Sequence, residues 1–450
     1  MDFSKPGTKE FWHSFPSRAI PEEVSTRIDV DWLEAEVKSL EDSMTVHERD
    51  MAHKAIRQLR EGAPAYQIAD LPGEIMKNSA SITKCGAAFT ETLEQWIEDG
   101  YVAGPFMEPP LAGFRANSLM AVEQKDKIRL VINMSHPKGR SFNNNVDKQV
   151  VGKATMSSAR QFGQAVKAAG RGAIMSKMDM KDAYKLVPAR CQDYRLQGFY
   201  WHGAYVIETQ QIFGANTAVE NFDIEAKTIW LLAKLRSKIP RQLIHQTLDD
   251  TACVGPAGSG WSEEFTRHYR EICGQANIRL AQECPLKEKA FTNTMEGTVL
   301  GIRFNSEKLA WRLPREKVND ILRDIHLFQT GGHVSLKQTQ QLAGRLNNLG
   351  QMCPFLKGFR RPLNKLLGKF GDNKWILLQV EPDLVAELRV WAAAACSAAT
   401  WLPIPDETQL PPLGALEFTS DAAGGTGNQD WAGVASIGHW PSGATKTGQV

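Results

Sequence analysis

Hydrophobic and polar positions repeat along this chain with two different periods, and the changes of period predict its elements. Apolar residues spaced three and four apart are typical of helices, whereas short apolar runs between turn residues are typical of strands. Residues 1–75 have the helical period, with Asp31 as the expected cap of a helix that begins at Trp32. A second helix is expected over 90–99, where Gly100 ends it.

The middle of the chain predicts strands that alternate with helices. In chain order we expect strands at 117–122 and 128–134, a helix at 158–169, strands at 174–178 and 205–207, a helix at 219–237, a hairpin at 243–254, a helix at 261–275, and strands at 298–304 and 309–313. This succession predicts an α+β fold in which helices cover an antiparallel sheet.

The last third of the chain is mostly helical in pattern and locally basic. Seven basic residues and no acidic one lie between Val334 and Phe370, on two amphipathic helices separated near Pro354. Such helices can dock on a phosphate backbone, with a membrane surface or a solvated face as the alternatives. Residues 376–398 predict a further helix, and the proline-rich segment 401–412 predicts a linker.

Composition narrows the function classes only moderately. The chain of 450 residues is 42% hydrophobic and 23% charged, with a net charge of +2, so any nucleic-acid surface has to be a local patch. Its seven cysteines form no C-x-x-C pair, which argues against a disulfide framework and a zinc knuckle. We find no signal peptide, and no apolar run approaches the roughly 20 residues of a membrane span.

Two carboxylate clusters carry the chemistry that the sequence suggests. Asp179 and Asp182 follow an apolar strand, and Asp249 and Asp250 stand at the tip of the expected hairpin. Acids at the ends of apolar strands are costly unless a positive group neutralises them. Magnesium ions and a nucleoside triphosphate would satisfy them. An Asp-Asp pair alone is more often an ordinary surface turn, so the order of the motifs has to decide.

In that order, the motifs resemble those of reverse transcriptases, and most closely those of DIRS-type retroelements, which belong with the retroviral and long-terminal-repeat polymerases. The resemblance runs from about Gly104 to Pro362, and the start of a ribonuclease H follows Leu413. The matching segments are Asp179-Met180-Lys181-Asp182-Ala183-Tyr184, Phe213-Gly214, Leu248-Asp249-Asp250, Val299-Leu300-Gly301-Ile302 and Thr419-Ser420-Asp421.

The resemblance implies a role for each matching residue. Two Mg²⁺ ions, with Mn²⁺ as the alternative, would be bound by Asp179, Asp249 and Asp250. The incoming nucleotide would be lined by Lys125, Arg129, Asp182, Ala183, Tyr184, Phe213 and Gly214, with Tyr184 as a steric gate against ribonucleotides. Leu300 and Gly301 would form the primer grip, and Lys289, or Lys287 in a shifted register, would protonate pyrophosphate. We assign template–primer backbone contacts to Lys337, Arg345, Lys357, Arg360 and Arg361.

The resemblance also implies a right-hand polymerase fold and its partners. The expected divisions are a helical extension at 1–75, fingers at 76–175, a palm with an antiparallel sheet at 176–313, a helical thumb and connection at 314–400, a linker at 401–412 and a ribonuclease H-like segment at 413–450. The partners would be an RNA template, a DNA or RNA primer and deoxynucleoside triphosphates, with no membrane. We expect an intracellular protein, in cytoplasm or nucleus, and leave its oligomeric state open.

Three functions therefore compete. The first is an RNA-directed DNA polymerase, a nucleotidyltransferase. The second is a catalytically impaired module that binds RNA or hybrid, favoured because Thr247 stands where these polymerases have an aromatic residue and Gln211-Ile212 precedes Phe213. The third is a primer-independent RNA polymerase, against which the bulk of Tyr184 argues. Only 38 residues run from Leu413 to the end, so we expect no ribonuclease H activity.

Overall fold

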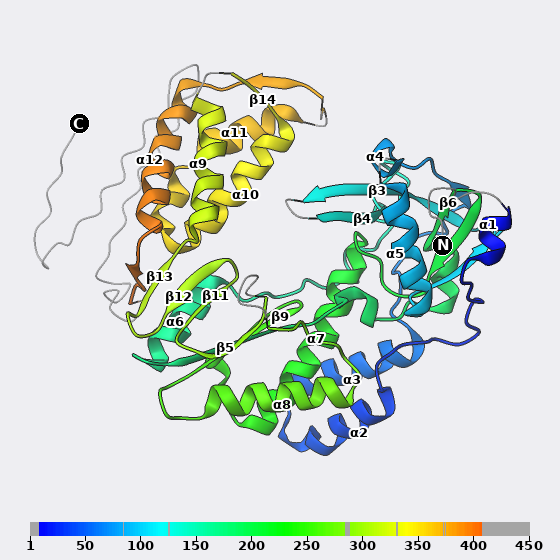
Figure 1. Cartoon of the computed structure of the whole chain (residues 1–450), viewed down its shortest axis with the longest axis horizontal. Coiled ribbons are helices and arrows are strands. Elements are labelled where there is room, and N and C mark those ends of the chain that lie inside the picture. The colour runs from blue at the N-terminus through cyan, green and yellow to red at the C-terminus, as the bar shows by residue number, and fades with distance from the viewer. Residues whose placement is uncertain are drawn as a thin grey trace, which may run out of the picture. The chain divides into compact units, whose positions relative to one another are not determined.

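The computed structural model describes residues 9–83, 85–124, 127–283, 289–329, 332–371, 373 and 375–406 (Figure 1). The chain divides into two compact units, Met1–Pro403 and Ile404–Val450, and nearly all described residues belong to the first. The strands expected after Leu413 lie outside the described residues. Within the described part, no helix combines the length and apolar character that crossing a membrane requires.

The N-terminal segment forms the three helices α1 (Lys9–Ser14), α2 (Val30–Leu40) and α3 (Val46–Glu61). The expected cap of α2 was wrong by two residues, because the Asp29 side chain accepts the Trp32 amide at 3.0 Å. Asp31 instead lies in the first turn, where it pairs with Arg60 at 2.7 Å. A capping box of Thr45 and Glu48 begins α3.

The first large sheet has six strands and is mixed. Its strands are β1 (Glu74–Ile75), β2 (Val102–Phe106), β3 (Arg115–Gln124), β4 (Lys127–Asn133), β6 (Gly198–Trp201) and β7 (Ala204–Glu208). The order is β1-β3-β6-β7-β2, and β4 pairs with β3. Because β3 runs parallel to β1 and β6, the expectation of an antiparallel sheet was wrong for this part of the fold.

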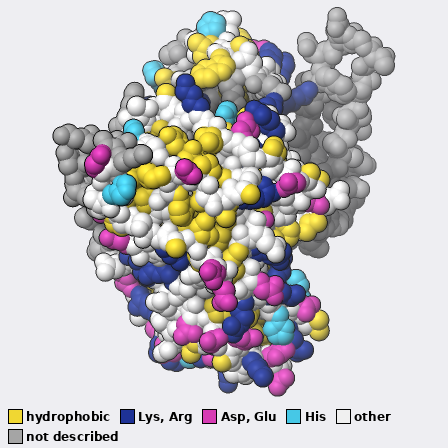
Figure 2. All heavy atoms as spheres, turned by 90° about the vertical axis from the view of Figure 1, so that its right-hand side faces the viewer, with side chains coloured by type: hydrophobic (Ala, Val, Ile, Leu, Met, Phe, Trp, Pro, Cys, Tyr) yellow, Lys and Arg dark blue, Asp and Glu magenta, His cyan; other side chains and the backbone are white. Residues whose placement is uncertain are grey.

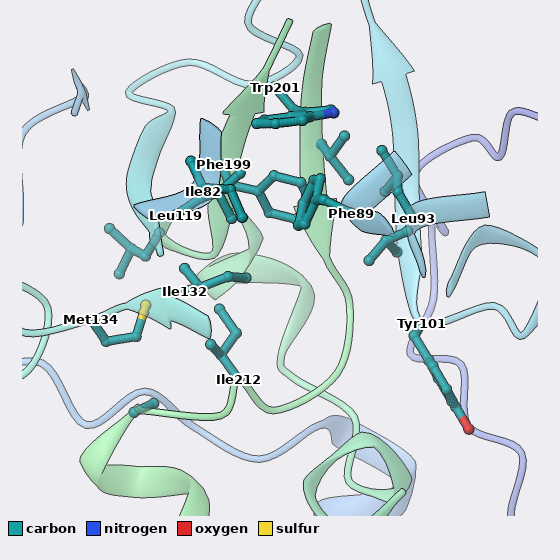
Figure 3. Close-up of a cluster of buried hydrophobic side chains, with 14 of the residues drawn as sticks. Ile82, Phe89, Leu93, Tyr101, Leu119, Ile132, Met134, Phe199, Trp201 and Ile212 are labelled. Atoms are coloured by element: carbon teal, nitrogen blue, oxygen red, sulfur yellow. The ribbon is translucent and has the colours of Figure 1, made fainter. Parts of the chain in front are cut away.

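Helix α5 (Gly86–Glu98) supplies much of the core of this region, and the short helix α4 (Ala80–Thr83) precedes it. Phe89, Leu93 and Ile97 recur every four residues, which places them on one helix face. They are buried in one cluster with residues of the sheet, among them Phe199 and Trp201 (Figure 3). The ring of Phe89 meets the Trp201 ring edge-on, with centroids 4.7 Å apart.

A second sheet of four strands follows the predicted antiparallel pattern. Its order is β10 (Phe291–Thr294), β5 (Ile174–Asp179), β9 (Asp250–Gly255) and β8 (Ile244–Thr247), and every pairing is antiparallel. Helix α6 (Ala159–Ala169) packs against β8 and β9, and helix α8 (Trp261–Gln275) packs against β5 and β9. Helix α7 (Asn216–Ser237) packs against α8. The expected hairpin at 243–254 is therefore confirmed.

A third sheet shows where the pattern misled us. The segment expected as one strand over 298–304 is a hairpin of β11 (Glu296–Val299) and β12 (Ile302–Asn305), followed by β13 (Ala310–Arg312) and β16 (Leu402–Pro403). Leu300 and Gly301 form its turn, with φ of 49° and 79°. Two successive residues with positive φ make the kind of tight turn that reverses a strand at once.

The remaining elements are helical, with one small exception. Helices α9 (Arg315–Gln329), α10 (Leu336–Met352), α11 (Arg361–Phe370) and α12 (Pro382–Ala398) form this part, and the break near Pro354 is confirmed. Strands β14 (His333–Ser335) and β15 (Leu377–Gln379) pair with each other. The helix expected from residue 376 was therefore wrong at its start, where Leu377–Gln379 is extended.

On the face that Figure 2 shows, hydrophobic side chains gather in the middle, and acidic and basic side chains are mixed over the lower part. A surface of mixed sign creates no extended positive field.

One glycine at the end of α3 is required by the fold, and its replacement is a first prediction. Gly62 has φ of 80°, and a Cβ there would lie 2.5 Å from the Ala189 carbonyl oxygen. Gly62→Ala should lower the free energy of unfolding by about 3 kcal/mol, because it combines an unfavourable backbone conformation with a backbone clash. Urea denaturation measures this change. Gly274→Ala in α8, where no atom lies within 4 Å of the added Cβ, is the control and should be neutral or slightly stabilising. Equal stabilities of the two variants would contradict the prediction.

Candidate active site

The strands β5 and β9 bring the two acidic clusters together. Asp179 is the register partner of Asp250, and the Met180 amide donates to the Asp249 carbonyl oxygen at 2.9 Å. Leu248 and Asp249 form the tight turn between β8 and β9, whose last pair is Thr247 and Asp250. Leu248 has φ of 54°, which is uncommon for a residue with a bulky side chain and marks a constrained turn. The three carboxylates predicted from the sequence therefore lie on neighbouring backbone positions.

A lysine that the sequence reasoning did not single out lies among these acids. Lys177, on β5, is 8% exposed, and its Nζ lies 3.0 Å from Asp250 Oδ1. Burial raises the pKa of Asp250 to about 6, the Lys177 charge opposes this rise, and the charges of Asp249 and Asp179 add to it. The signal in the sequence was a charged residue within the strand predicted over Ile174–Met178.

The carboxylates of this site fit magnesium only if phosphates and water supply its other ligands. Among the described residues, no three carboxylate, histidine or cysteine side chains converge as a group that could hold a metal ion. Magnesium in phosphoryl-transfer sites is usually bound by one or two carboxylates, with substrate phosphates and water completing its six oxygen ligands. Asp179, Asp249 and Asp250 therefore fit a metal that arrives with a triphosphate, and they do not make a metal cage of protein groups alone.

The residues after Asp179 form a compact turn. Asp182 has φ of 67°, and a 3₁₀ helix spans Ala183–Leu186. The Asp182 carboxylate accepts hydrogen bonds from Arg279 Nη2 at 2.5 Å and from the Tyr101 hydroxyl at 3.1 Å. Its side chain is thus held by two residues that the sequence reasoning missed, and it fixes the turn on which Ala183 and Tyr184 lie.

Tyr184 and Phe213, predicted separately, are in contact. The ring of Tyr184 meets the Phe213 ring edge-on with centroids 4.7 Å apart, and the Phe222 ring with centroids 5.6 Å apart. Burial raises the pKa of Tyr184, and the charge of Asp249 raises it further, which indicates that the tyrosine lies close to the acidic cluster. Phe213 is 40% exposed, so this aromatic pair borders solvent.

Gly214 is positioned by a buried asparagine. Asn143 donates to the Gly214 carbonyl oxygen at 2.7 Å and accepts the Asn216 amide at 2.8 Å, where α7 begins. Gly214 has φ of 106°, and a Cβ there would lie 3.1 Å from the Ile132 carbonyl oxygen. Glycine at this position therefore permits both the backbone conformation and the close approach.

Only some of the basic residues predicted to bind the triphosphate lie in the part of the chain that the structure describes. Lys125 and Lys287 lie outside the described residues. Arg129 pairs with Val122 in the β3–β4 hairpin, but its side chain is also outside the described part. Lys289 is exposed and lies two residues before Phe291, the register partner of Lys177.

The predicted primer-grip residues form the turn between β11 and β12, and helices α9 and α10 cover it. Asn348 of α10 donates to the Leu300 carbonyl oxygen at 3.4 Å. The Lys317 side chain of α9 lies over Gly301, where an added Cβ would meet its Nζ at 1.8 Å. Burial lowers the pKa of Lys317, the charge of Glu316 opposes this, and the charge of Lys177 lowers it further. Strand β11, which leads into this turn, contacts β5, so the turn lies near the strand that carries Asp179.

The five basic residues assigned to template–primer contact differ in whether their side chains are exposed or already paired with other groups of the protein. Lys337, Lys357 and Arg361 are exposed, and Arg360 donates to Asn347 Oδ1 at 3.1 Å. Arg345 is engaged by acids of α9, because it forms ion pairs with Asp324 and, at 3.7 Å, with Asp320. Arg345 is therefore neutralised by acids of the chain, whereas Lys337, Lys357 and Arg361 are exposed.

Comparison with known proteins gives a fold and no closer relation. No protein family model matches the sequence, and no curated protein matches it. A foamy viral protease-reverse transcriptase in complex with double-stranded DNA has a TM-score of 0.52 and 15% identity over 84% of this chain and 62% of that chain. The foamy viral protease-reverse transcriptase in complex with an RNA/DNA hybrid has the same TM-score, 0.52, and identity, 15%, over 84% of this chain and 48% of that chain.

The chain therefore spans less than two thirds of the length of either solved chain. At 15% identity the likeness concerns the fold and leaves substrates open. The acidic clusters, the aromatic pair and the tight turn at Leu300-Gly301 all lie within a mixed α/β chain that has a reverse-transcriptase-like fold.

Proposed function

We propose that this chain is the RNA-directed DNA polymerase of a retroelement, a nucleotidyltransferase with fingers at 76–175, a palm at 176–313 and a thumb at 314–400. The observation that carries the proposal is the register of Asp179 with Asp250, with Asp249 at the adjoining turn. A polymerase site needs two carboxylates on rigid neighbouring strands, and β5 and β9 supply them. The fold likeness to reverse transcriptases supports this reading.

Asp179 and Asp249 would hold two magnesium ions, with Asp250 beside them. When bound, these ions would neutralise the triphosphate and lower the pKa of the primer 3′-hydroxyl. The chain itself positions the reactants. Tyr184, fixed by Phe213 and Phe222, would crowd a ribose 2′-hydroxyl, and Lys125 and Arg129 would hold the β- and γ-phosphates.

The primer end and the duplex would be held further along the chain. The Leu300-Gly301 turn is covered by Asn348 and Lys317, so its backbone has a fixed place next to the strands that carry the acids. Lys337, Lys357 and Arg361 would contact phosphates without reading sequence. The two similar solved structures are complexes with double-stranded DNA and with an RNA/DNA hybrid, which supports nucleic acid as the partner here.

A catalytically impaired module that binds hybrid is the second candidate. Thr247 donates to the Ser157 carbonyl oxygen at 3.0 Å, in place of the aromatic side chain expected near the primer end. Lys177 also occupies one oxygen of Asp250. Both features could weaken catalysis while leaving the binding surface intact.

Primer extension separates the two candidates. Purified protein would be given a poly(rA) template, an oligo(dT) primer, dTTP and Mg²⁺, beside an Asp249→Asn variant. Extension that disappears in the variant would establish the polymerase. No extension together with salt-dependent hybrid binding would favour the binding module, and absence of both would reject both functions.

The phosphate contacts proposed for the thumb predict how the affinity for a hybrid depends on salt concentration. The double variant Lys357→Ala/Arg361→Ala should reduce the slope of log affinity against log salt concentration for a hybrid by about 2, because each exposed cation releases about one counterion. Arg345→Ala should leave the slope unchanged, since Asp320 and Asp324 already neutralise that guanidinium. Fluorescence anisotropy at several salt concentrations measures both slopes. Equal slopes for all three proteins would contradict this binding surface.

A further inference from the structure

Lys177 occupies an unusual position for a buried lysine. It precedes Asp179 by two residues on β5, and alternation along a strand places both side chains on the same face of the sheet. Its ammonium lies 3.0 Å from Asp250 Oδ1, on the neighbouring strand. The positive charge of Lys177 therefore lies beside the acidic cluster, on a strand of the same sheet.

This pair differs from ion pairs on the protein surface. Lys177 is 8% exposed, and the Asp250 side chain is 26% exposed, so solvent screens their attraction only partly. Without Lys177, the mutual repulsion of the three acids Asp179, Asp249 and Asp250 would increase, because Asp250 would lose the ammonium that it contacts. The pair also occupies one Asp250 oxygen. This agrees with the finding that, among the described residues, no three side chains of metal-ligand type lie together as a group that could hold a metal ion.

We propose that Lys177 is a positioning residue that acts as a built-in counter-ion of the acidic cluster. It holds Asp250, stabilises the fold before any metal binds, and weakens the binding of a free divalent cation. A cation would then bind firmly only when a triphosphate adds negative charge to the site. The inference deepens the proposed polymerase function and rests on it for the identity of the triphosphate.

The expected effect follows from Coulomb's law. A unit positive charge a few ångströms from a divalent cation is strongly repulsive in a partly buried site. Its removal should therefore tighten cation binding by at least about tenfold, even when the remaining groups relax. The same removal leaves the acids less compensated, so the metal-free protein should become less stable.

The test measures Mn²⁺ binding without nucleotide, from the loss of the free-ion signal in electron paramagnetic resonance, together with thermal melting with and without Mn²⁺. The neutral variant is Lys177→Gln, which can still donate a hydrogen bond to Asp250. Lys177→Arg keeps the charge and should bind Mn²⁺ within about threefold of the unaltered chain. Lys181→Gln removes the same charge from an exposed lysine two residues beyond Asp179, and serves as the matched control.

We expect Lys177→Gln to bind Mn²⁺ at least about tenfold more tightly, to melt lower without the ion and to gain more from it. Lys181→Gln should change neither property appreciably. Unchanged or weaker binding by Lys177→Gln, or equal tightening by both neutral variants, would overturn the proposal. If Lys177→Gln does not fold, Mn²⁺ binding by Lys177→Met in the full chain is judged by the same criterion. Tighter Mn²⁺ binding by Lys177→Arg, which keeps the positive charge, would reject a charge effect.

Primer extension is scored separately from Mn²⁺ binding. Tightened binding in Lys177→Gln with no extension by any protein would leave the counter-ion in place and reject the polymerase. Extension by the unaltered chain with no change of affinity in Lys177→Gln would reject the counter-ion alone.

Discussion

Replacing Asp179 with asparagine should reduce primer extension by at least about a thousandfold, the largest effect that we expect from any single substitution. Asp179 ends β5 as the register partner of Asp250, and in the proposed site it would be a ligand of the metal ions. An amide is nearly equal to a carboxylate in size but carries no negative charge, so the metal would lose its ligand while the sheet keeps its shape. Single-turnover extension with saturating hybrid measures the loss.

Two comparisons show whether the loss concerns chemistry. Hybrid affinity should stay within about threefold of the unaltered chain, because the proposed phosphate contacts lie on the thumb. Asp250→Asn should lose less activity than Asp179→Asn, since Lys177 already engages the Asp250 carboxylate. An Asp179→Asn protein that extends primers at the unaltered rate would exclude Asp179 as a metal ligand.

The strands that carry the acids could be predicted because their signals are local. The strand at Ile174–Met178 and the turn at Leu248-Asp249 each lie within a few residues of the acid that they position. Helix α8 was likewise predicted with its bounds, because its apolar face repeats without interruption over Trp261–Gln275. The roles of these residues stay predictions, since the fold likeness does not test them.

The partners of those residues could not be predicted, because they come from distant parts of the chain. Arg279 and Asp182 are 97 positions apart, and Asn143 reaches Gly214 across 71. No local period marks a residue whose hydrogen-bond partner belongs to another element. The parallel pairing of β3 with β1 and β6 was missed for the same reason.

Another contact between separate elements, the ion pair of Lys185 and Glu208, links the turn after β5 to the six-stranded sheet. Lys185 lies in the 3₁₀ helix that follows Asp182, and Glu208 ends β7. Their side chains are 6% and 1% exposed, and the Lys185 ammonium also lies 4.5 Å from the centre of the Trp96 ring. The lysine ammonium is thus in contact with a carboxylate and with an aromatic face.

Breaking this pair from one side should destabilise the chain more than any surface substitution. Glu208→Leu leaves the Lys185 charge buried without its counter-ion and should lower the free energy of unfolding by about 3–5 kcal/mol. Lys185→Met should be similarly harmful, whereas Lys185→Met/Glu208→Leu should recover most of the loss, because an apolar pair carries no desolvation penalty. Urea denaturation of the four proteins gives the coupling between the two positions. Additive losses in the double variant would show that the two charges do not depend on each other.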